Sequence, residues 1–296
     1  MWWNNRENMK LPRVTIKGLL EAGVHLGHKT FRWNPKMSKF IFGSKNSIHI
    51  IDLVQTLEMT NAALQGIYKC VSSGGKLLFV STKKQAAATI SQLAKDTSQY
   101  YVNHRWLGGM LTNWKTISNS IKYYKKLSEQ MKTENLGLTK KEILKMGKER
   151  DKLERSIGGI SEMKKVPDMI FIIDTNIESL AVKEAQKLNI PIVAIVDTNS
   201  DPTGINYPIP GNDDARRAIN LYCDLVKETV LDAQKNIVSK KDESDFEKKV
   251  TKTSIVNEKA EEIKPKAQTK EKKNNVEKKS KSIFSKIKTL ASKKIK

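Results

Sequence analysis

The sequence predicts an α/β fold: a parallel sheet between helical layers, an inserted antiparallel α-helical hairpin (coiled coil) and a disordered basic C-terminal tail. Three observations support this fold class. Short apolar strand-like runs alternate with amphipathic helical segments, helix-capping residues follow the strand-like runs, and residues 113–157 have helical periodicity only. Repeated strand–helix units connect through right-handed crossovers, which make the strands parallel.

The first half of the chain supplies a leading helix and two strand–helix units. Thr15–Ala22 reads as a helix that ends at Gly23, and Ile48–Ile51 reads as a strand. Asp52 is expected to cap the next helix, with Gln55 as its reciprocal capping-box partner. The second unit is expected to begin with a strand at Lys76–Val80. Thr82 and Gln85 are then expected to form a capping box, which opens a helix with Ile90 and Leu93 facing inward.

The second half repeats the pattern twice. Asp168–Ile173 is the third predicted strand, and Thr175 with Glu178 forms a capping box that opens a helix. The inward stripe of this helix is predicted to be Ile177, Ala181, Ala185 and Leu188. Ile192–Val196 is almost entirely apolar, as expected of a strand that is covered on both faces.

A capped helix follows the fourth strand. Asn212 is the predicted cap, and Asp213 and Asp214 in the first turn suit the positive end of the helix dipole. The expected inward residues are Ile219, Tyr222, Cys223, Val226 and Val230.

Residues 113–157 break the alternation, because they hold two helical patterns around a turn at Leu136–Leu138. The first helix repeats apolar residues at Trp114, Ile117, Ile121, Tyr124 and Met131. The second has a Thr139–Glu142 capping box and an apolar series at Ile143, Met146, Leu153 and Ile157. An antiparallel hairpin inserted in the α/β domain accounts for both, and glycine pairs at 108–109 and 158–159 suit its junctions.

The chain divides by composition into four parts. Residues 1–8 are an extension or an incorrectly assigned start, residues 9–112 and 158–235 form the α/β domain, and residues 113–157 form the hairpin. Residues 236–296 are rich in lysine and polar residues, and too poor in apolar ones to offset the entropy of ordering.

The net charge of the chain is +22, which favours a polyanionic partner such as nucleic acid. From Gln234 onward there are 20 lysines and no arginine against 9 acidic residues, which leaves a net +11 on the body before it. The two cysteines, Cys70 and Cys223, fall on apolar helix faces and predict buried thiols in a reducing compartment. No apolar run approaches the roughly 20 residues needed to span a bilayer, so no membrane partner is expected.

Three long motifs resemble the small-subunit ribosomal protein S2 family in its bacterial or organellar form. They are LLEAGVHLGHKTFRWNPKM (Leu19–Met37), YVNHRWLGGMLTNW (Tyr101–Trp114), and the segment Pro167–Ala215, which begins PDMIFIIDTN and ends PIPGNDDA. They occur in the family's order, with the predicted hairpin between the second and third, and the resemblance covers residues 9–235.

The resemblance implies a flavodoxin-like sheet domain with a protruding coiled coil, and a structural rather than enzymatic role. It implies a monomer within the small subunit of a bacterial, cytoplasmic ribosome, or of an organellar one. The implied partners are small-subunit rRNA and neighbouring proteins, including ribosomal protein S1. No cofactor is implied. Residues 1–8 and the lysine-rich tail depart from the family pattern.

Two clusters are the candidate RNA-binding residues. The first, between Gly27 and Lys39, alternates cations that can neutralise phosphates with aromatic rings that can stack on unpaired bases. It comprises His28, Lys29, Phe31, Arg32, Trp33, Lys36 and Lys39. The second comprises Asn103, Arg105, Trp106 and Asn113, where a planar guanidinium and amides lie beside a glycine pair. A structural junction packed around Trp106 is an equal alternative for the second cluster.

Other arrangements are weaker candidates. His25 and His28 lack the further ligands of a zinc site, so no metal is expected there. Asp174, Asp197 and Asp201 follow strand ends, where ligands of parallel sheets bind, which keeps open a nucleotide- or metal-dependent enzyme. No phosphate-binding glycine motif or catalytic triad accompanies them. A polycationic nucleic-acid chaperone acting through the tail is the other alternative.

Overall fold

The computed structural model describes residues 11–132 and 139–237, all within one unit of the chain, residues 1–241. Its helices are α1 (Ile16–Glu21), α2 (Leu53–Ser72), α3 (Ala87–Asp96), α4 (Trp114–Gln130), α5 (Lys140–Ile157) and α6 (Ser179–Lys187). A last helix covers residues 216–237. Three 3-10 helices are η1 (Thr30–Arg32), η2 (Pro35–Phe40) and η3 (Gly158–Ile160). The strands are β1 (Leu26–Lys29), β2 (Ile41–Lys45), β3 (Ile48–Ile51), β4 (Leu77–Val80), β5 (Tyr100–Val102), β6 (Met169–Ile173), β7 (Ile192–Val196) and β8 (Tyr207–Pro210).

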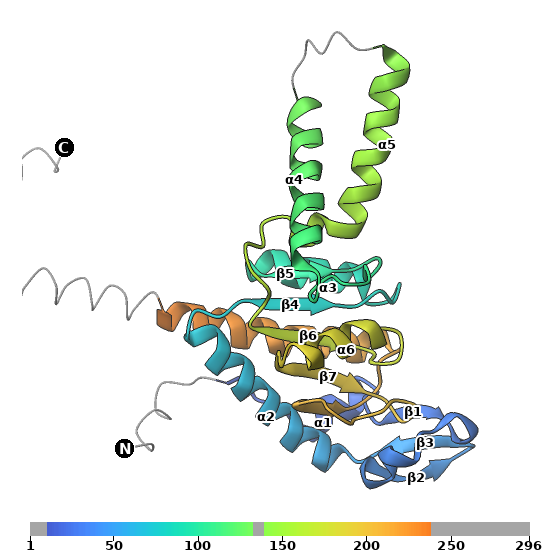
Figure 1. The fold of residues 1–296 in the computed structure, drawn as a ribbon. Coiled ribbons are helices and arrows are strands. Elements are labelled where there is room, and N and C mark those ends of the chain that lie inside the picture. The colour runs from blue at the N-terminus through green and yellow to red at the C-terminus, as the bar shows by residue number, and fades with distance from the viewer. Residues whose placement is uncertain (1–10, 133–138, 238–296) are drawn as a thin grey trace, which may run out of the picture. The chain divides into compact units, whose positions relative to one another are not determined.

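The centre of the fold is a five-stranded sheet in the order β5-β4-β6-β7-β8, with every pair parallel (Figure 1). Three of the four predicted strands belong to this sheet as β4, β6 and β7, and each is fully buried. The prediction of a parallel sheet among helices is therefore confirmed.

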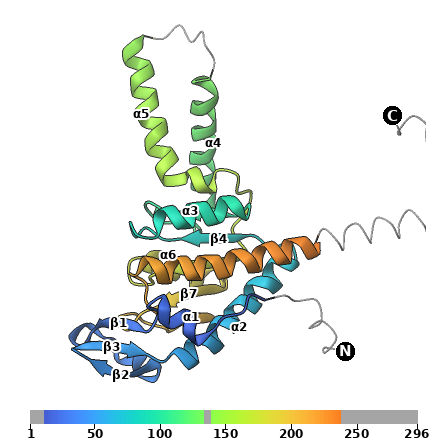
Figure 2. The same ribbon diagram turned by 180° about the vertical axis from the view of Figure 1, so that it is seen from behind.

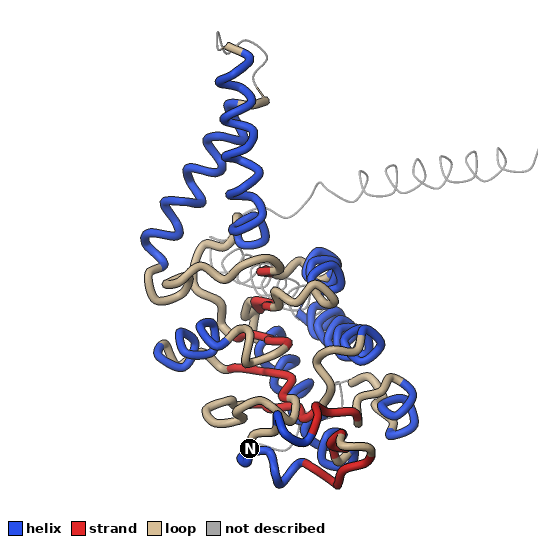
Figure 3. The backbone as a smooth tube through the Cα atoms, turned by 90° about the vertical axis from the view of Figure 1, so that its right-hand side faces the viewer, coloured by secondary structure: helices blue, strands red, loops and turns tan. Residues whose placement is uncertain are grey.

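Alternate residues along each strand enter different cores, because successive side chains point to opposite faces of a sheet. Phe79 and Phe171 face the core formed with α2, α3 and the last helix, and their rings meet edge to face at 5.9 Å. Figure 2 shows these helices on one side of the sheet. Leu78 and Ile172 face the second core, which includes α6 and the bases of α4 and α5. Figure 3 shows the strands running between the two helical layers.

The strand at Ile48–Ile51 is present as β3, but it does not belong to the parallel sheet. It is the middle strand of a separate antiparallel sheet, β1-β3-β2. The connection between β2 and β3 uses Asn46 and Ser47 at φ of 52° and 59°, which is the left-handed geometry of a tight hairpin turn. The predicted strand and the helix capped by Asp52 are both present. The expectation that this strand joins the parallel sheet is wrong, because β3 pairs with the unpredicted strands β1 and β2.

The two outer strands of the parallel sheet, β5 and β8, were also not predicted. β5 has only three residues, too few for a clear pattern. β8 reads Tyr-Pro-Ile-Pro, and proline normally argues against a strand. Its position at the edge resolves the conflict, because only one side of the strand needs to donate hydrogen bonds to a neighbour.

Two predicted capping boxes are absent. α3 begins after Ala86 without a side-chain cap, and α6 begins after Glu178 without one. Thr82 and Glu178 instead bond to each other, since the Thr82 N–H donates to the Glu178 carboxylate at 2.6 Å. Asp52 does cap α2, although Gln55 donates to the Asp52 side chain rather than accepting from its backbone.

The predicted stripe of α6 is half correct. Ala181 and Ala185 are buried, whereas Ile177 and Leu188 are exposed because they lie just outside the two ends of the helix. The last helix begins at residue 216, so Asn212, Asp213 and Asp214 precede its first turn, where the prediction had Asn212 as the cap. Asn212 accepts hydrogen bonds from the backbone of Asp214 and Ala215 in the turn before the helix. All five predicted inward residues are buried, namely Ile219, Tyr222, Cys223, Val226 and Val230.

The two helices predicted at residues 113–157 are α4 and α5, which pack beside each other (Figure 1). Thr139 and Glu142 form the expected reciprocal capping box of α5. The turn predicted at Leu136–Leu138 lies outside the described residues, as do residues 1–8 and the tail 238–296.

Both cysteines carry free thiols; Cys223 is buried and Cys70 is half-buried. Among the described helices, none has the length and apolar character needed to cross a membrane.

Candidate functional site

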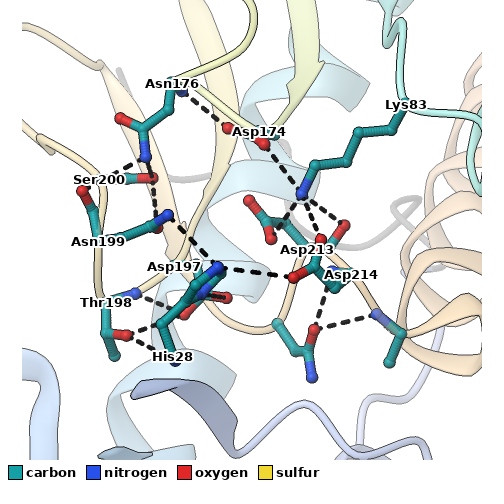
Figure 4. Close-up of polar contacts among 12 residues, drawn as sticks. His28, Lys83, Asp174, Asn176, Asp197, Thr198, Asn199, Ser200, Asp213 and Asp214 are labelled. Atoms are coloured by element: carbon teal, nitrogen blue, oxygen red, sulfur yellow. Dashed lines mark hydrogen bonds and ion pairs between the residues drawn. The ribbon is translucent and has the colours of Figure 1, made fainter. Parts of the chain in front are cut away.

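Charged side chains converge where the parallel strands end (Figure 4). Asp174 follows β6, Asp197 follows β7, and Asp213 lies in the loop after β8. Lys83 reaches them from the loop after β4, and His28 reaches them from β1. We call these five residues the strand-end cluster.

Lys83 holds the centre of this cluster. Its ammonium lies 2.8 Å from a carboxylate oxygen of Asp174 and 2.8 Å from one of Asp213. A third ion pair, at 2.7 Å, joins it to Asp214, which is half exposed. Asp174 adopts a left-handed backbone with φ of 73°, and its other oxygen accepts from the Asn176 and Ile177 amides.

His28 connects the cluster to the first predicted RNA-binding loop. Its Nδ1 lies 2.9 Å from a carboxylate oxygen of Asp197, and its backbone N–H donates to the Thr198 hydroxyl at 2.9 Å. Gly27 permits this approach, since a Cβ at that position would meet the Thr198 side chain at 2.6 Å. The other oxygen of Asp197 accepts from the Thr198 backbone and hydroxyl.

The buried charges shift one another's pKa values. Burial raises the pKa of Asp213, and the charges of Asp197 and Asp174 raise it further. Burial lowers the pKa of Lys83, but its carboxylate partners outweigh burial and hold it above its ordinary value. The hydrogen bond to Asp197 raises the pKa of His28 more than burial lowers it.

Further contacts attach the first loop to the loop after β7. The Asn34 N–H donates to the carbonyl of Thr198 at 2.7 Å, and Lys36 pairs with Asp201 at 2.7 Å. Asp201 therefore does not join Asp174 and Asp197 in the cluster, although all three follow strand ends. Residues 28, 34 and 36 thus contact three residues of a single loop, Asp197, Thr198 and Asp201.

This attachment leaves most of the first predicted cluster exposed. Phe31 has 73% of its surface accessible, and Trp33 has 41% accessible and lies against the His49 ring. The exposed cations of the loop are Lys29, Arg32, Lys36 and Lys39. His28 is the exception, since it is half-buried in the strand-end cluster. The loop thus presents cations and aromatic rings to solvent, while its backbone is hydrogen-bonded to Thr198.

The second predicted cluster is organised by a residue that the sequence analysis missed. Glu184 of α6 is buried, and its carboxylate accepts hydrogen bonds from the loop that precedes α4. The donors are Trp106 Nε1, the backbone of Gly109, Leu111 and Thr112, and the Thr112 hydroxyl. Burial alone raises the pKa of Glu184, but these hydrogen bonds outweigh it and hold the pKa below its ordinary value.

The members of the second cluster consequently differ in accessibility. Trp106 is only 6% exposed and packs in the core, which supports the structural alternative for this residue. Asn103 is half-buried and donates to the Ala87 carbonyl, whereas Arg105 and Asn113 are exposed. Asn113 precedes α4 and accepts from the Thr116 hydroxyl.

The structure does not bring the two predicted clusters together. The second follows β5, at one edge of the sheet, and the first lies against the loop after β7, with β4 and β6 between them. No sequence pattern indicated that Lys83 belongs to a charged cluster. The sequence analysis predicted it to lie at the start of a capped helix. No local pattern marks Lys83 or Glu184, because the hydrogen-bond partners of their side chains lie 72 or more residues away in the chain.

Comparison with known proteins decides the family. The sequence profile of the family described as Ribosomal protein S2 matches residues 19–233. The chain belongs to the ribosomal protein S2 family. The match spans both predicted RNA-binding clusters and every residue of the strand-end cluster, so the described geometry is that of an S2 protein.

Individual relatives agree with this assignment. The chain is 58% identical over 224 residues to the small ribosomal subunit protein uS2 of Parvibaculum lavamentivorans, which covers 76% of this chain and 88% of the relative. It is likewise 58% identical to uS2 of Chelativorans sp., at 76% and 84% coverage, and 59% identical to uS2 of Gluconacetobacter diazotrophicus, at 76% and 86%. Family membership confirms the prediction of a structural, non-enzymatic protein.

The two carboxylates on which the enzymatic alternative rested, Asp174 and Asp197, are buried, and Lys83 and His28 are their respective partners.

Proposed function

We propose that this chain is a structural constituent of the small ribosomal subunit and binds small-subunit rRNA through its exposed cationic loop. The observation that carries the proposal is the family match over residues 19–233. The basic charge and the solvent-facing loop supply the physical means, because lysine and arginine release counterions from RNA while shape and stacking select the site. The exposed residues Arg105 and Asn113 are a second contact in this proposal.

The finer features of the proposal rest on the family. α4 and α5 form a coiled-coil projection of a flavodoxin-like domain, with boundaries at 9–112, 113–157 and 158–235. The protein is a monomer within a bacterial cytoplasmic ribosome, and ribosomal protein S1 is among its neighbours. The bacterial relatives support a bacterial ribosome over an organellar one as the location of this chain.

The test of the function is sedimentation of a cell lysate through sucrose gradients at moderate and at high salt, with detection of this chain. We expect it to migrate with the small subunit and with whole ribosomes at moderate salt. A chain that stayed at the top of the gradient as free protein would contradict the proposal. Removal of residues 236–296 tests the alternative of a nucleic-acid chaperone that acts through the tail. Under the ribosomal proposal, the remaining body should still join small subunits.

Neutralising two loop cations should weaken the salt dependence of RNA binding. We expect the double variant Arg32→Gln/Lys36→Gln to reduce the slope of log affinity against log salt by about 1–2, because each lost phosphate contact removes roughly 0.7–0.9 from it. The measurement is filter binding of the purified chain to a small-subunit rRNA fragment at several salt concentrations. The control, Lys95→Gln/Lys187→Gln, removes the same charge from exposed helix positions away from the loop. Equal slopes for both variants would exclude the loop from the interface.

Replacement of Phe31 can distinguish a loss of RNA stacking from a loss of protein stability. Because its ring is 73% exposed, we expect Phe31→Ala to change the free energy of unfolding by less than about 0.5 kcal/mol. The same variant should lose about 1–3 kcal/mol of RNA affinity, the contribution of one base stacked on an aromatic ring. Phe42, which is 80% exposed on β2, provides the matched control. Equal losses of affinity for Phe31→Ala and Phe42→Ala would show that stacking is not specific to the loop.

A further inference from the structure

The strand-end cluster contains more negative charge than its described neighbours balance. Three carboxylates, Asp174, Asp197 and Asp213, are at most 4% exposed, and Asp214 joins them at the surface. Lys83 contributes one positive charge and a protonated His28 contributes another. The net charge of these six side chains is therefore −2. Unbalanced charge in a buried site is unfavourable unless a cation or a proton neutralises it.

The cluster also contains polar atoms without hydrogen bonds. One carboxylate oxygen of Asp213 lies 2.8 Å from the Lys83 ammonium, whereas the other has no hydrogen-bond partner among the described residues. The Tyr222 hydroxyl, on a side chain that is 2% exposed, likewise has no hydrogen-bond partner among them. It lies close enough to Asp197 and Asp213 that their charges add to the effect of burial in raising the pKa of Tyr222. Buried polar groups of native proteins normally find partners, so these atoms indicate a missing ligand.

The ligand atoms are arranged for a single ion. One ring nitrogen of His28 and one carboxylate oxygen each from Asp197 and Asp213 all lie within 4.8 Å of one another. An ion bonded to each of them at about 2.0–2.2 Å would draw the ligand atoms slightly closer together than this limit. Asp214 is half exposed, and its carboxylate oxygen 3.6 Å from His28 Nε2 offers a further ligand.

The donor set selects the kind of metal. One imidazole nitrogen with two or three carboxylate oxygens suits Zn²⁺ and related transition-metal ions, whereas Mg²⁺ prefers an octahedron of oxygen ligands with several waters. We propose that His28, Asp197 and Asp213 form a structural site for a divalent transition-metal ion, with Zn²⁺ as the best fit. The site is distinct from the His25–His28 pair considered from the sequence, because His25 is not one of the three grouped ligands.

The ion has a structural consequence. His28 lies in β1, Asp197 follows β7 and Asp213 precedes the last helix, so one ion joins three segments far apart in the chain (Figure 4). It anchors the base of the 27–36 loop to the end of the parallel sheet. This inference does not depend on RNA binding, and its test does not use RNA.

The experiment uses the purified full chain, stripped of metal with a chelator. Titration calorimetry with Zn²⁺ and elemental analysis after equilibrium dialysis should give one ion per chain, and Mg²⁺ in large excess should not displace it. We expect His28→Asn and Asp197→Asn to lose at least ~100-fold in affinity, because even changes behind the ligands cost 10–100-fold. His104→Asn and Cys70→Ser, which remove ligand-type side chains elsewhere, should bind as the unchanged chain does.

Two measurements on the unchanged chain remain decisive if the variants fail to fold. Zn²⁺ should raise the Tm of the stripped protein, and a chelator should reverse the rise. Co²⁺ in place of Zn²⁺ should give visible absorption bands and paramagnetic shifts of one histidine ring. Absence of stoichiometric binding would overturn the proposal. So would Mg²⁺ binding in preference to Zn²⁺, or full affinity in His28→Asn.

Discussion

Replacement of Lys83 by methionine is expected to lower the free energy of unfolding by about 3–5 kcal/mol, the usual cost of removing one partner from a buried ion pair. The substitution retains most of the aliphatic stem but leaves Asp174 and Asp213 buried without the ammonium 2.8 Å from each. Since small domains are stable by only about 5–15 kcal/mol, the loss is a large fraction of the total. Urea denaturation of the full chain in chelator-containing buffer measures it.

The neighbouring residue provides the control for this prediction. Lys84 is exposed, so Lys84→Met should change stability by less than about 0.5 kcal/mol. The double variant Lys83→Met/Asp174→Asn should recover part of the loss, because it removes one of the uncompensated charges. If Lys83→Met and Lys84→Met had equal effects, the ion pairs would not be stabilising the strand ends.

Replacement of Glu184 by alanine is the second large effect that we expect, with a loss on the order of 4 kcal/mol. Charged hydrogen bonds contribute about 1.5–3 kcal/mol each, and water can satisfy some of the half-buried donors once the carboxylate is gone. The donors left behind include the indole of Trp106 and the backbone amides of Gly109 and Leu111. Urea denaturation gives the stability, and hydrogen exchange should show faster exchange at residues 109–112.

Lys183→Ala on the same helix is the matched control, since Lys183 is exposed and next in sequence to Glu184. It should leave both the stability and the exchange rates of residues 109–112 unchanged. Unaltered protection of these amides in Glu184→Ala would mean that the carboxylate does not hold the loop. The effect is local, so amides of β6 should remain protected in all three proteins at low denaturant.

Local patterns in the sequence were sufficient for part of the fold. β4, β6 and β7 are apolar runs of four or five residues that are buried on both faces. Such a run is typical of a central strand of a parallel sheet, so its assignment as a strand was clear from the sequence. The last helix was predicted with its buried stripe, because that signal lies within the segment itself. The alternating cations and aromatic rings of the first loop were visible for the same reason, and the structure leaves most of them exposed.

Other features depend on residues that are distant in the sequence, and these only the tertiary structure decided. Thr82 and Glu178 resemble members of two separate capping boxes, but packing places them against each other, 96 residues apart in the chain. The assignment of β3 to a separate sheet depends on β1 and β2 lying beside it, and β8 is a strand only because β7 offers it an edge.

The same distinction applies to the candidate site. The sequence by itself determined the family and the exposed loop, since both are written in continuous motifs. It could not show that Lys83 lies among three aspartates, that Glu184 holds the loop of Trp106, or that His28 turns inward. The physical reason is that a buried charge is stabilised by whichever partners the fold brings near, and no local periodicity records that proximity.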